Sequence, residues 1–287
     1  MIDQSEITWG IVAPPLLMAV GIATIAQFPL LKRTVFMGVL TAVIFAVCQL
    51  GFRGWAMPGK DVQDWPAWIA LTGGVFTYCW MCHHGLWPWR IFMRLIITGL
   101  AVWLLLKPQI QSEGTITIVT WVIGGAMTWT ALMMAWERVH TVTSEKIQLT
   151  TFVALSGLTA MSLLLFNCLT HAQYSGILTT ALTAALVIAW WRPSWINSQG
   201  IVTVIALILP TLWLLSNRYS NLPNWALPLL ALAGLAPLIA MGNPVRHWSE
   251  WKRLAITVAV LATVLLPVVI WGVVTSLRAT AEPSYGY

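Results

Sequence analysis

Charged residues are scarce in this chain. Lys, Arg, Asp and Glu make up 8% of the 287 residues, whereas apolar residues make up 59%. A soluble domain carries about 25% charged residues. No gap between the apolar stretches could hold a folded soluble domain, which excludes a nucleotide-binding module, a soluble catalytic domain and a receptor ectodomain. We therefore expect an all-α, polytopic membrane protein that forms a single transmembrane domain over residues 1–287.

The sequence also lacks the features of a secretory leader. Its first ten residues contain Asp3 and Glu6 but no Lys or Arg. A signal peptide has a basic region before its apolar core and small residues at its cleavage site. We therefore expect no cleaved signal peptide, and we expect the protein to be integral to a plasma (inner) membrane.

Motifs for catalysis are missing as well. There is no Ser-His-Asp set, no paired carboxylate motif, no phosphate-binding glycine loop and no H-E-x-x-H. We also expect no ionisable residue in any helix interior, where such a residue usually marks an ion path or a substrate site. The sequence therefore predicts no catalytic residues, and it argues against ion-coupled transport.

The apolar stretches have the length of membrane helices, since about 20 apolar residues cross roughly 30 Å of hydrocarbon. We predict ten spans, at about residues 9–30, 34–52, 66–84, 90–107, 115–136, 149–168, 174–191, 198–216, 223–241 and 254–276. One set of alternate loops holds Lys32, Arg33, Arg90, Arg94, Arg138, Lys146, Arg192, Arg246, Lys252 and Arg253. The other set holds Arg53, Lys60, Lys107, Arg218 and Arg278. The positive-inside rule places the first set in the cytoplasm and both termini on the non-cytoplasmic side.

This distribution also explains the net charge of +6. Basic residues at the ends of membrane helices encode orientation, so we expect the lipid bilayer as a partner and no nucleic acid. Most of the 19 tryptophans lie at predicted helix ends. They are typical of the aromatic belts that anchor a bundle at the headgroups.

A weak internal repeat is visible in the second half of the chain. The pattern A-L-x-x-A-W-x-R at residues 131–138 recurs 54 residues later at 185–192, and Arg246 follows after another 54. A helical-hairpin repeat of about 54 residues over 115–253 would account for it. Alternatively, similar helices that end at the same interface have converged on Trp and Arg. Gly124 and Thr128 form a small-xxx-small face of the kind that lets helices approach closely.

The stretch C-W-M-C-H is the one candidate cofactor-binding motif, through Cys79, Cys82 and His83. It has the spelling of c-type haem attachment, and on a helix the three residues share one face. The charge count, however, places His83 at the cytoplasmic end, whereas c-type haem is attached on the opposite side of the membrane. The alternatives are a redox dithiol, a zinc or copper(I) site that uses His83 or His84, and cysteines that serve as small buried apolar residues. The last of these needs no cofactor and no metal, and we expect it.

His140 and His247 fall on the same predicted side as His83. The bundle could bring these imidazoles together, although interfacial histidines in loops are usually solvated.

Three functions are compatible with these features. We expect first a non-catalytic membrane subunit or scaffold, whose small-residue faces pack against other membrane subunits in a larger assembly. The second is a permease for an uncharged or lipophilic molecule, which needs a cavity near the proline breaks. The third is a membrane redox, metal or haem protein centred on Cys79, Cys82 and His83.

Overall fold

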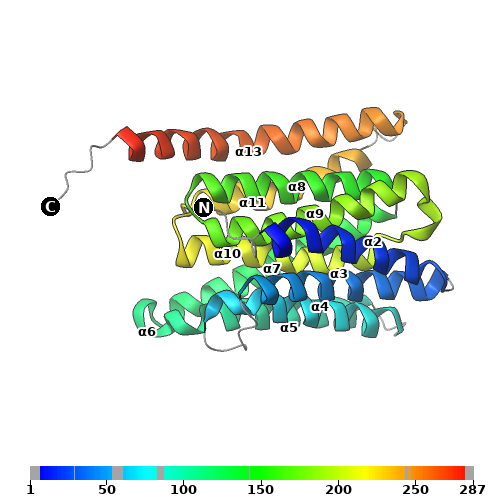
Figure 1. Cartoon of the computed structure of the whole chain (residues 1–287). Helices are drawn as coiled ribbons and strands as arrows, with labels where there is room; N and C mark the ends of the chain where they lie inside the picture. Colours follow the sequence, from blue (N-terminus) through cyan, green and yellow to red (C-terminus); the bar gives the residue numbers. More distant parts are fainter. Residues whose placement is uncertain are drawn as a thin grey trace.

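The structure is a computed structural model that describes residues 7–28, 30–53, 61–82, 87–141, 143–242, 245 and 247–281. Over these residues the chain forms a bundle of helices and no strand (Figure 1). Eight of the described helices are long and apolar enough to cross a membrane. The prediction of an all-α membrane-type bundle is confirmed at this level.

Helices occupy each of the ten predicted segments. The first half of the chain contains η1 (Thr8–Val12), α2 (Ala13–Ile25), α3 (Leu30–Phe52), η2 (Val62–Asp64), α4 (Trp65–Cys82), α5 (Trp87–Leu106), η3 (Lys107–Gln109) and α6 (Ile110–Glu113). The second half contains α7 (Thr115–His140), α8 (Glu145–Leu165), α9 (Leu169–Trp191), η4 (Pro193–Trp195), α10 (Gln199–Tyr219), α11 (Ala226–Gly234), η5 (Ala236–Met241) and α13 (Glu250–Ala281).

The segment expected at 223–241 is not one continuous helix. α11 ends at Gly234, and the chain continues as the 3-10 helix η5. Pro237 lacks the N–H that would continue an α-helical ladder. At the junction of α11 and η5, the carbonyl of Gly234 accepts a hydrogen bond from the indole N–H of Trp136 in α7. This segment therefore enters the bundle as a short, interrupted helix.

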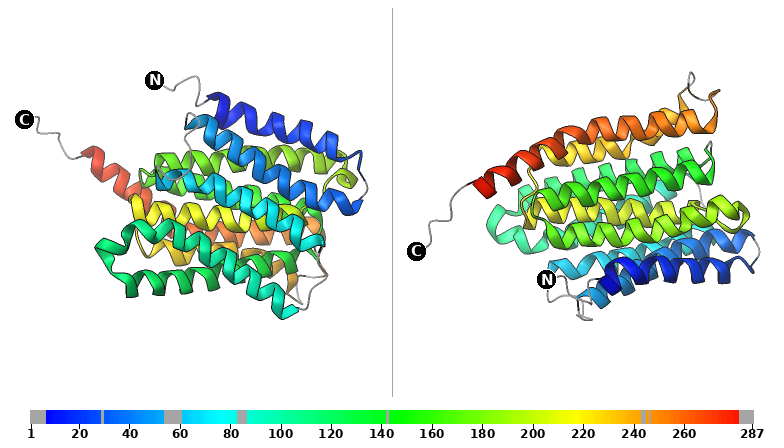
Figure 2. Two further views of the ribbon diagram at one scale, coloured as in Figure 1. Left: turned by 90° about the horizontal axis from the view of Figure 1, so that it is seen from below. Right: turned by 45° about the horizontal axis from the view of Figure 1, so that its top comes forward.

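Helix α10 runs through the middle of the bundle (Figure 2). Every residue from Gly200 to Ser216 is buried, and α10 contacts α3, α4, α7 and α9 among others. Its sequence is apolar on all sides, which suits a helix that has no lipid-facing or water-facing surface. Side chains of α10 thus fill the centre of the bundle.

Glycine permits the closest contact with α10. A Cβ added at Gly38 of α3 would lie 2.7 Å from the backbone oxygen of Gly200 and 2.9 Å from the Cγ2 of Thr77. Backbone cannot move aside as a side chain can, so only glycine fits between α3, α4 and α10 at this point.

The two ends of the bundle differ in their connections. We call the Arg53 end the one that contains Arg53, the start of α7 and the link from α10 to α11. The opposite end, the His140 end, contains the α7–α8 and α9–α10 connections. η1 begins at the Arg53 end, where Trp9 lies against Gly51, and α13 ends on the same side of the bundle (Figure 1).

Candidate functional site

A cavity of about 390 Å³ lies between α7, α10 and α11. Its wall is mainly apolar and includes three tryptophans. The lining residues are Val102, Thr120, Trp121, Gly124, Gly125, Thr128, Trp129, Leu132, Pro210, Trp213, Leu214, Asn224, Leu227, Pro228 and Ala231. The volume is within the range of about 300–1,000 Å³ that is usual for small-molecule sites.

The sequence of α7 creates this space. Gly124 has no atom within 4 Å of the place where a Cβ would stand, so the absent side chain leaves a hollow. Thr120, Gly124 and Thr128 follow one another at intervals of four residues, and all three are exposed. At the bottom of the cavity Trp129, by contrast, is buried. The cavity therefore opens sideways along one face of α7.

The threonine hydroxyls on the wall are already used within α7. Thr120 donates to the carbonyl of Ile116 at 3.0 Å, and Thr128 donates to that of Gly124 at 2.8 Å. The indole N–H of Trp213 donates to Thr159 Oγ1 at 3.3 Å, away from the lining residues. The middle of the cavity consequently offers apolar contact and few hydrogen bonds.

Polar groups gather where the cavity meets the Arg53 end. The guanidinium of Arg218 lies 4.0 Å from the centroid of the Trp121 ring, in cation–π contact. The same guanidinium donates to Glu113 Oε1 at 2.7 Å. Asn224 lines the cavity, and its Oδ1 accepts from Asn217 Nδ2 at 2.9 Å. We call Gln109, Glu113, Asn217, Arg218 and Asn224 the polar rim.

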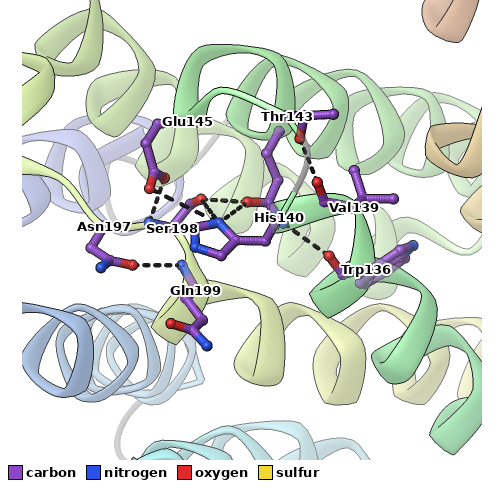
Figure 3. A network of polar contacts seen from close by, with 9 residues as sticks. Trp136, Val139, His140, Thr143, Glu145, Asn197, Ser198 and Gln199 are labelled. Carbon is purple, nitrogen blue, oxygen red and sulfur yellow. Dashed lines mark hydrogen bonds and ion pairs between the residues drawn. The ribbon is translucent and has the colours of Figure 1, made fainter. Parts of the chain in front are cut away.

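A second polar cluster lies at the His140 end, where α7, α8 and α10 meet (Figure 3). His140 Nδ1 lies 2.9 Å from Gln148 Oε1 and 3.2 Å from Ser198 Oγ. The Ser198 amide donates to Glu145 Oε2 at 2.6 Å, and Gln148 Nε2 donates to the Trp136 carbonyl at 3.2 Å. These bonds hold the start of α10 against the α7–α8 connection.

Ser198, His140 and Glu145 resemble a hydrolytic triad only in composition. In a triad the serine contacts one imidazole nitrogen and the acid contacts the other. Here Ser198 Oγ and Glu145 Oε1 both approach Nδ1, the latter at 3.9 Å. Ser198 is also fully buried, so no substrate carbonyl can reach its hydroxyl. The cluster is suited to holding helices together.

A third cluster surrounds Arg53. Its guanidinium donates to Asp61 at 2.9 Å and to Asp64 at 3.1 Å. Partial burial acts to lower the pKa of Arg53, but Tyr174 and the two carboxylates outweigh that effect, so the pKa is raised. His171 and Tyr174 of α9 complete the cluster and are buried. Asp64 is only 1% exposed, so its contact with Arg53 pairs a buried carboxylate with a cation.

The cofactor motif predicted from the sequence lies at the end of α4, where the described residues stop at Cys82. Cys79 and Cys82 lie in the last turn of α4, but their side chains are not described, and His83 lies outside the described residues. The site therefore stays a prediction, which an optical spectrum and a metal analysis of the purified protein can test. Among the described residues no group of three His, Cys, Asp or Glu side chains could hold a metal ion. His140 belongs to the cluster of Figure 3, and His247 is exposed in a turn.

The expectation that helix interiors contain no ionisable residue was wrong. Arg94 of α5 is 5% exposed, and it is hydrogen-bonded to Glu137 of α7. Arg94 lies close to the start of its predicted segment, and the positive-inside count therefore grouped it with the loop residues. The opposite charge on a neighbouring helix allows this guanidinium to be buried.

The permease alternative required a cavity near the proline breaks, and Pro210 and Pro228 line this pocket. The position of the pocket on the Gly124–Thr128 face of α7 was not predicted. Gly124 and Thr128 were interpreted as a face for close helix packing. In the structure this face has no helix upon it and lines the cavity instead.

Comparison of the chain with protein-family models, with curated proteins and with solved structures found no match.

Proposed function

We propose that the protein binds a lipophilic molecule, taken from the bilayer, in the pocket between α7, α10 and α11. The supporting observation is the position of the cavity, which opens along the exposed Thr120–Gly124–Thr128 face of a membrane-type helix. In a bilayer this face borders hydrocarbon, so an apolar ligand can enter without crossing water. Tryptophan and proline walls provide wide, rigid contact surfaces for such a ligand.

Binding is better supported than passage across the membrane. The centre of the bundle is occupied by α10, and the lining residues of α10 are limited to Pro210, Trp213 and Leu214. A permease pathway would need lining residues along the length of a helix. The pocket instead occupies the part of α10 that leads towards the Arg53 end.

The setting we propose for this site follows from the charge distribution. The chain crosses a plasma (inner) membrane ten times, and the Arg53 end and both termini face away from the cytoplasm. The polar rim of the pocket then lies towards the non-cytoplasmic surface of the membrane.

Photolabelling with a small apolar diazirine tests the proposal. The protein is reconstituted in phosphatidylcholine bilayers and labelled, and the modified residues are located by peptide mass spectrometry. Trp213 is 2% exposed in the fold, so a probe in the surrounding lipid cannot reach it except through the pocket. We expect label on the Pro210–Leu214 stretch of α10, and much less label on the equally buried stretch Val202–Ile205.

Two leucine substitutions provide the matched control. Gly124→Leu places a side chain in the hollow, where an added Cβ meets no atom within 4 Å, and should abolish the labelling of α10. Gly176→Leu on α9 also meets open space, but it lies outside the pocket and should leave the labelling unchanged. Absence of label from Pro210–Leu214 in the unmodified protein would overturn the proposal.

A second candidate function is that of a subunit in a larger membrane assembly. One observation favours it: the exposed Thr120–Gly124–Thr128 face has the small-xxx-small spacing that transmembrane helices use for close packing. A partner helix on this face would close the pocket. Native gel electrophoresis of a mild-detergent extract distinguishes the two, because a subunit migrates with its partners and loses them in Gly124→Leu. Migration as a bare monomer after the gentlest extraction would exclude the assembly.

A further inference from the structure

The polar rim has hydrogen-bonding capacity that the protein does not use. Gln109 Oε1, Asn217 Oδ1 and Arg218 Nε are buried and have no hydrogen-bond partner. An unpaired buried polar atom costs about 1–3 kcal/mol. The unpaired atoms on these three neighbouring residues therefore cost free energy in the folded protein. A ligand that forms hydrogen bonds with them could recover it.

These three residues are connected directly to the pocket. Gln109 Nε2 donates to the carbonyl of Arg218 at 3.0 Å, and the guanidinium of Arg218 covers Trp121, which lines the pocket. Asn217 donates to Asn224, which also lines the pocket. At the Arg53 end of the pocket, Arg218 and Asn217 therefore lie directly behind the lining residues Trp121 and Asn224.

The charges at the rim select against an ionic ligand. Arg218 is paired with Glu113 at 2.7 Å, so the two charges cancel. An anionic group placed beside Arg218 would be repelled by Glu113, and a cationic group placed beside Glu113 would be repelled by Arg218. The rim therefore offers an uncharged ligand one unpaired donor, Arg218 Nε, and two unpaired acceptors, Gln109 Oε1 and Asn217 Oδ1. The amide of Asn224 is a further polar group.

The two ends of the pocket differ in polarity. Its lining extends along α7 from Thr120 to Leu132, which at 1.5 Å per residue is about 18 Å. The rim lies beyond the Thr120 end, whereas Leu132, at the other end, is buried among apolar residues. A ligand that suits both ends is apolar along its length and polar at one terminus.

We infer that the pocket binds an amphiphile with an apolar chain and an uncharged, hydrogen-bonding head group, which lies at Asn217, Arg218 and Asn224. This inference rests on the proposed function and specifies its ligand class. The hydroxyl groups of a monoacylglycerol can donate to the amide oxygens, and its hydroxyl or ester oxygens can accept from Arg218 Nε.

Competition against the diazirine label tests the head group. Three lipids with the same oleoyl or oleyl chain are added to the reconstituted protein: 1-oleoylglycerol, 1-oleoylglycerol 3-phosphate and oleylamine. We expect 1-oleoylglycerol to displace the label from Pro210–Leu214 at a bilayer mole fraction about tenfold lower than either charged lipid, since one satisfied buried group is worth about that factor.

Two asparagines in the link between α10 and α11 supply matched variants. Asn224→Ala should raise the mole fraction of 1-oleoylglycerol needed for displacement by about three- to tenfold. Displacement in each variant is measured against that variant's own labelling without a competitor. Asn221→Ala is the control, since Asn221 is exposed in the same link and does not line this pocket.

The outcomes separate the inference from the proposed function. Equal competition by all three lipids, stronger competition by a charged lipid, or an unchanged response in Asn224→Ala would overturn the head-group assignment while the pocket remained a lipophile site. If α10 takes up no label even without a competitor, both proposals are overturned.

Discussion

The buried ion pair between Arg94 and Glu137 gives the sharpest prediction about stability. The side chain of Arg94 is 6% exposed and that of Glu137 is 25% exposed, and the two are hydrogen-bonded across the α5–α7 interface. Removal of one partner leaves the other charge buried without its counter-ion. Removal of both partners leaves an apolar contact between the helices.

The expected magnitudes follow from these exposures. Loss of one partner of a fully buried pair costs about 3–5 kcal/mol, and the partial exposure of Glu137 argues for the lower figure, about 3 kcal/mol. This corresponds to a more than hundredfold change in the ratio of folded to unfolded protein. Replacement of both partners by apolar residues is often neutral, so the double variant should recover most of that loss.

A double-mutant cycle measures this coupling. Arg94→Met, Glu137→Met and the double variant are unfolded by SDS in mixed micelles, and loss of tertiary structure is followed by tryptophan fluorescence. Arg138→Met is the control, because Arg138 is the exposed neighbour of Glu137 and should change the free energy of unfolding by less than about 0.5 kcal/mol. A double variant no more stable than Glu137→Met would refute the reasoning.

Two further predictions concern packing and reactivity. Gly38→Ala should lower the free energy of unfolding by about 2 kcal/mol or more, because its Cβ would lie 2.7 Å from the backbone oxygen of Gly200. Gly124→Ala, whose Cβ meets nothing, should have no such effect in the same unfolding assay, and equal stability of the two variants would contradict the close contact of α3 with α10. Burial raises the pKa of the Cys168 thiol, so in a variant with Cys168 as its single cysteine a smaller fraction of the thiol is ionised at pH 8 than in an exposed cysteine. Alkylation by iodoacetamide should then be slower in the folded protein than after SDS unfolding; rapid alkylation of the folded protein would show that Cys168 is accessible.

The elements of the fold could be predicted from the sequence because their cause is local. Each apolar run of about 20 residues satisfies its own backbone hydrogen bonds as a helix, so the run alone indicates the element. The segment at 223–241 departed from this rule at Gly234, where a following proline interrupts the ladder and a carbonyl is bonded by Trp136. Pro237 was visible in the sequence, but its indole partner on α7 was not.

The candidate site depended on which helix faces which. Gly124 and Thr128 were read correctly as a small-residue face, but the sequence could not tell that this face would line a cavity beside Pro210 rather than support a helix. The burial of Arg94 depends on its ion pair with the carboxylate of Glu137, which lies 43 residues further along the chain. Composition and local hydrogen bonding determined that this chain forms membrane helices. The pocket, the buried ion pair and the polar rim were decided by the tertiary structure alone, because each requires side chains from helices that are distant in sequence.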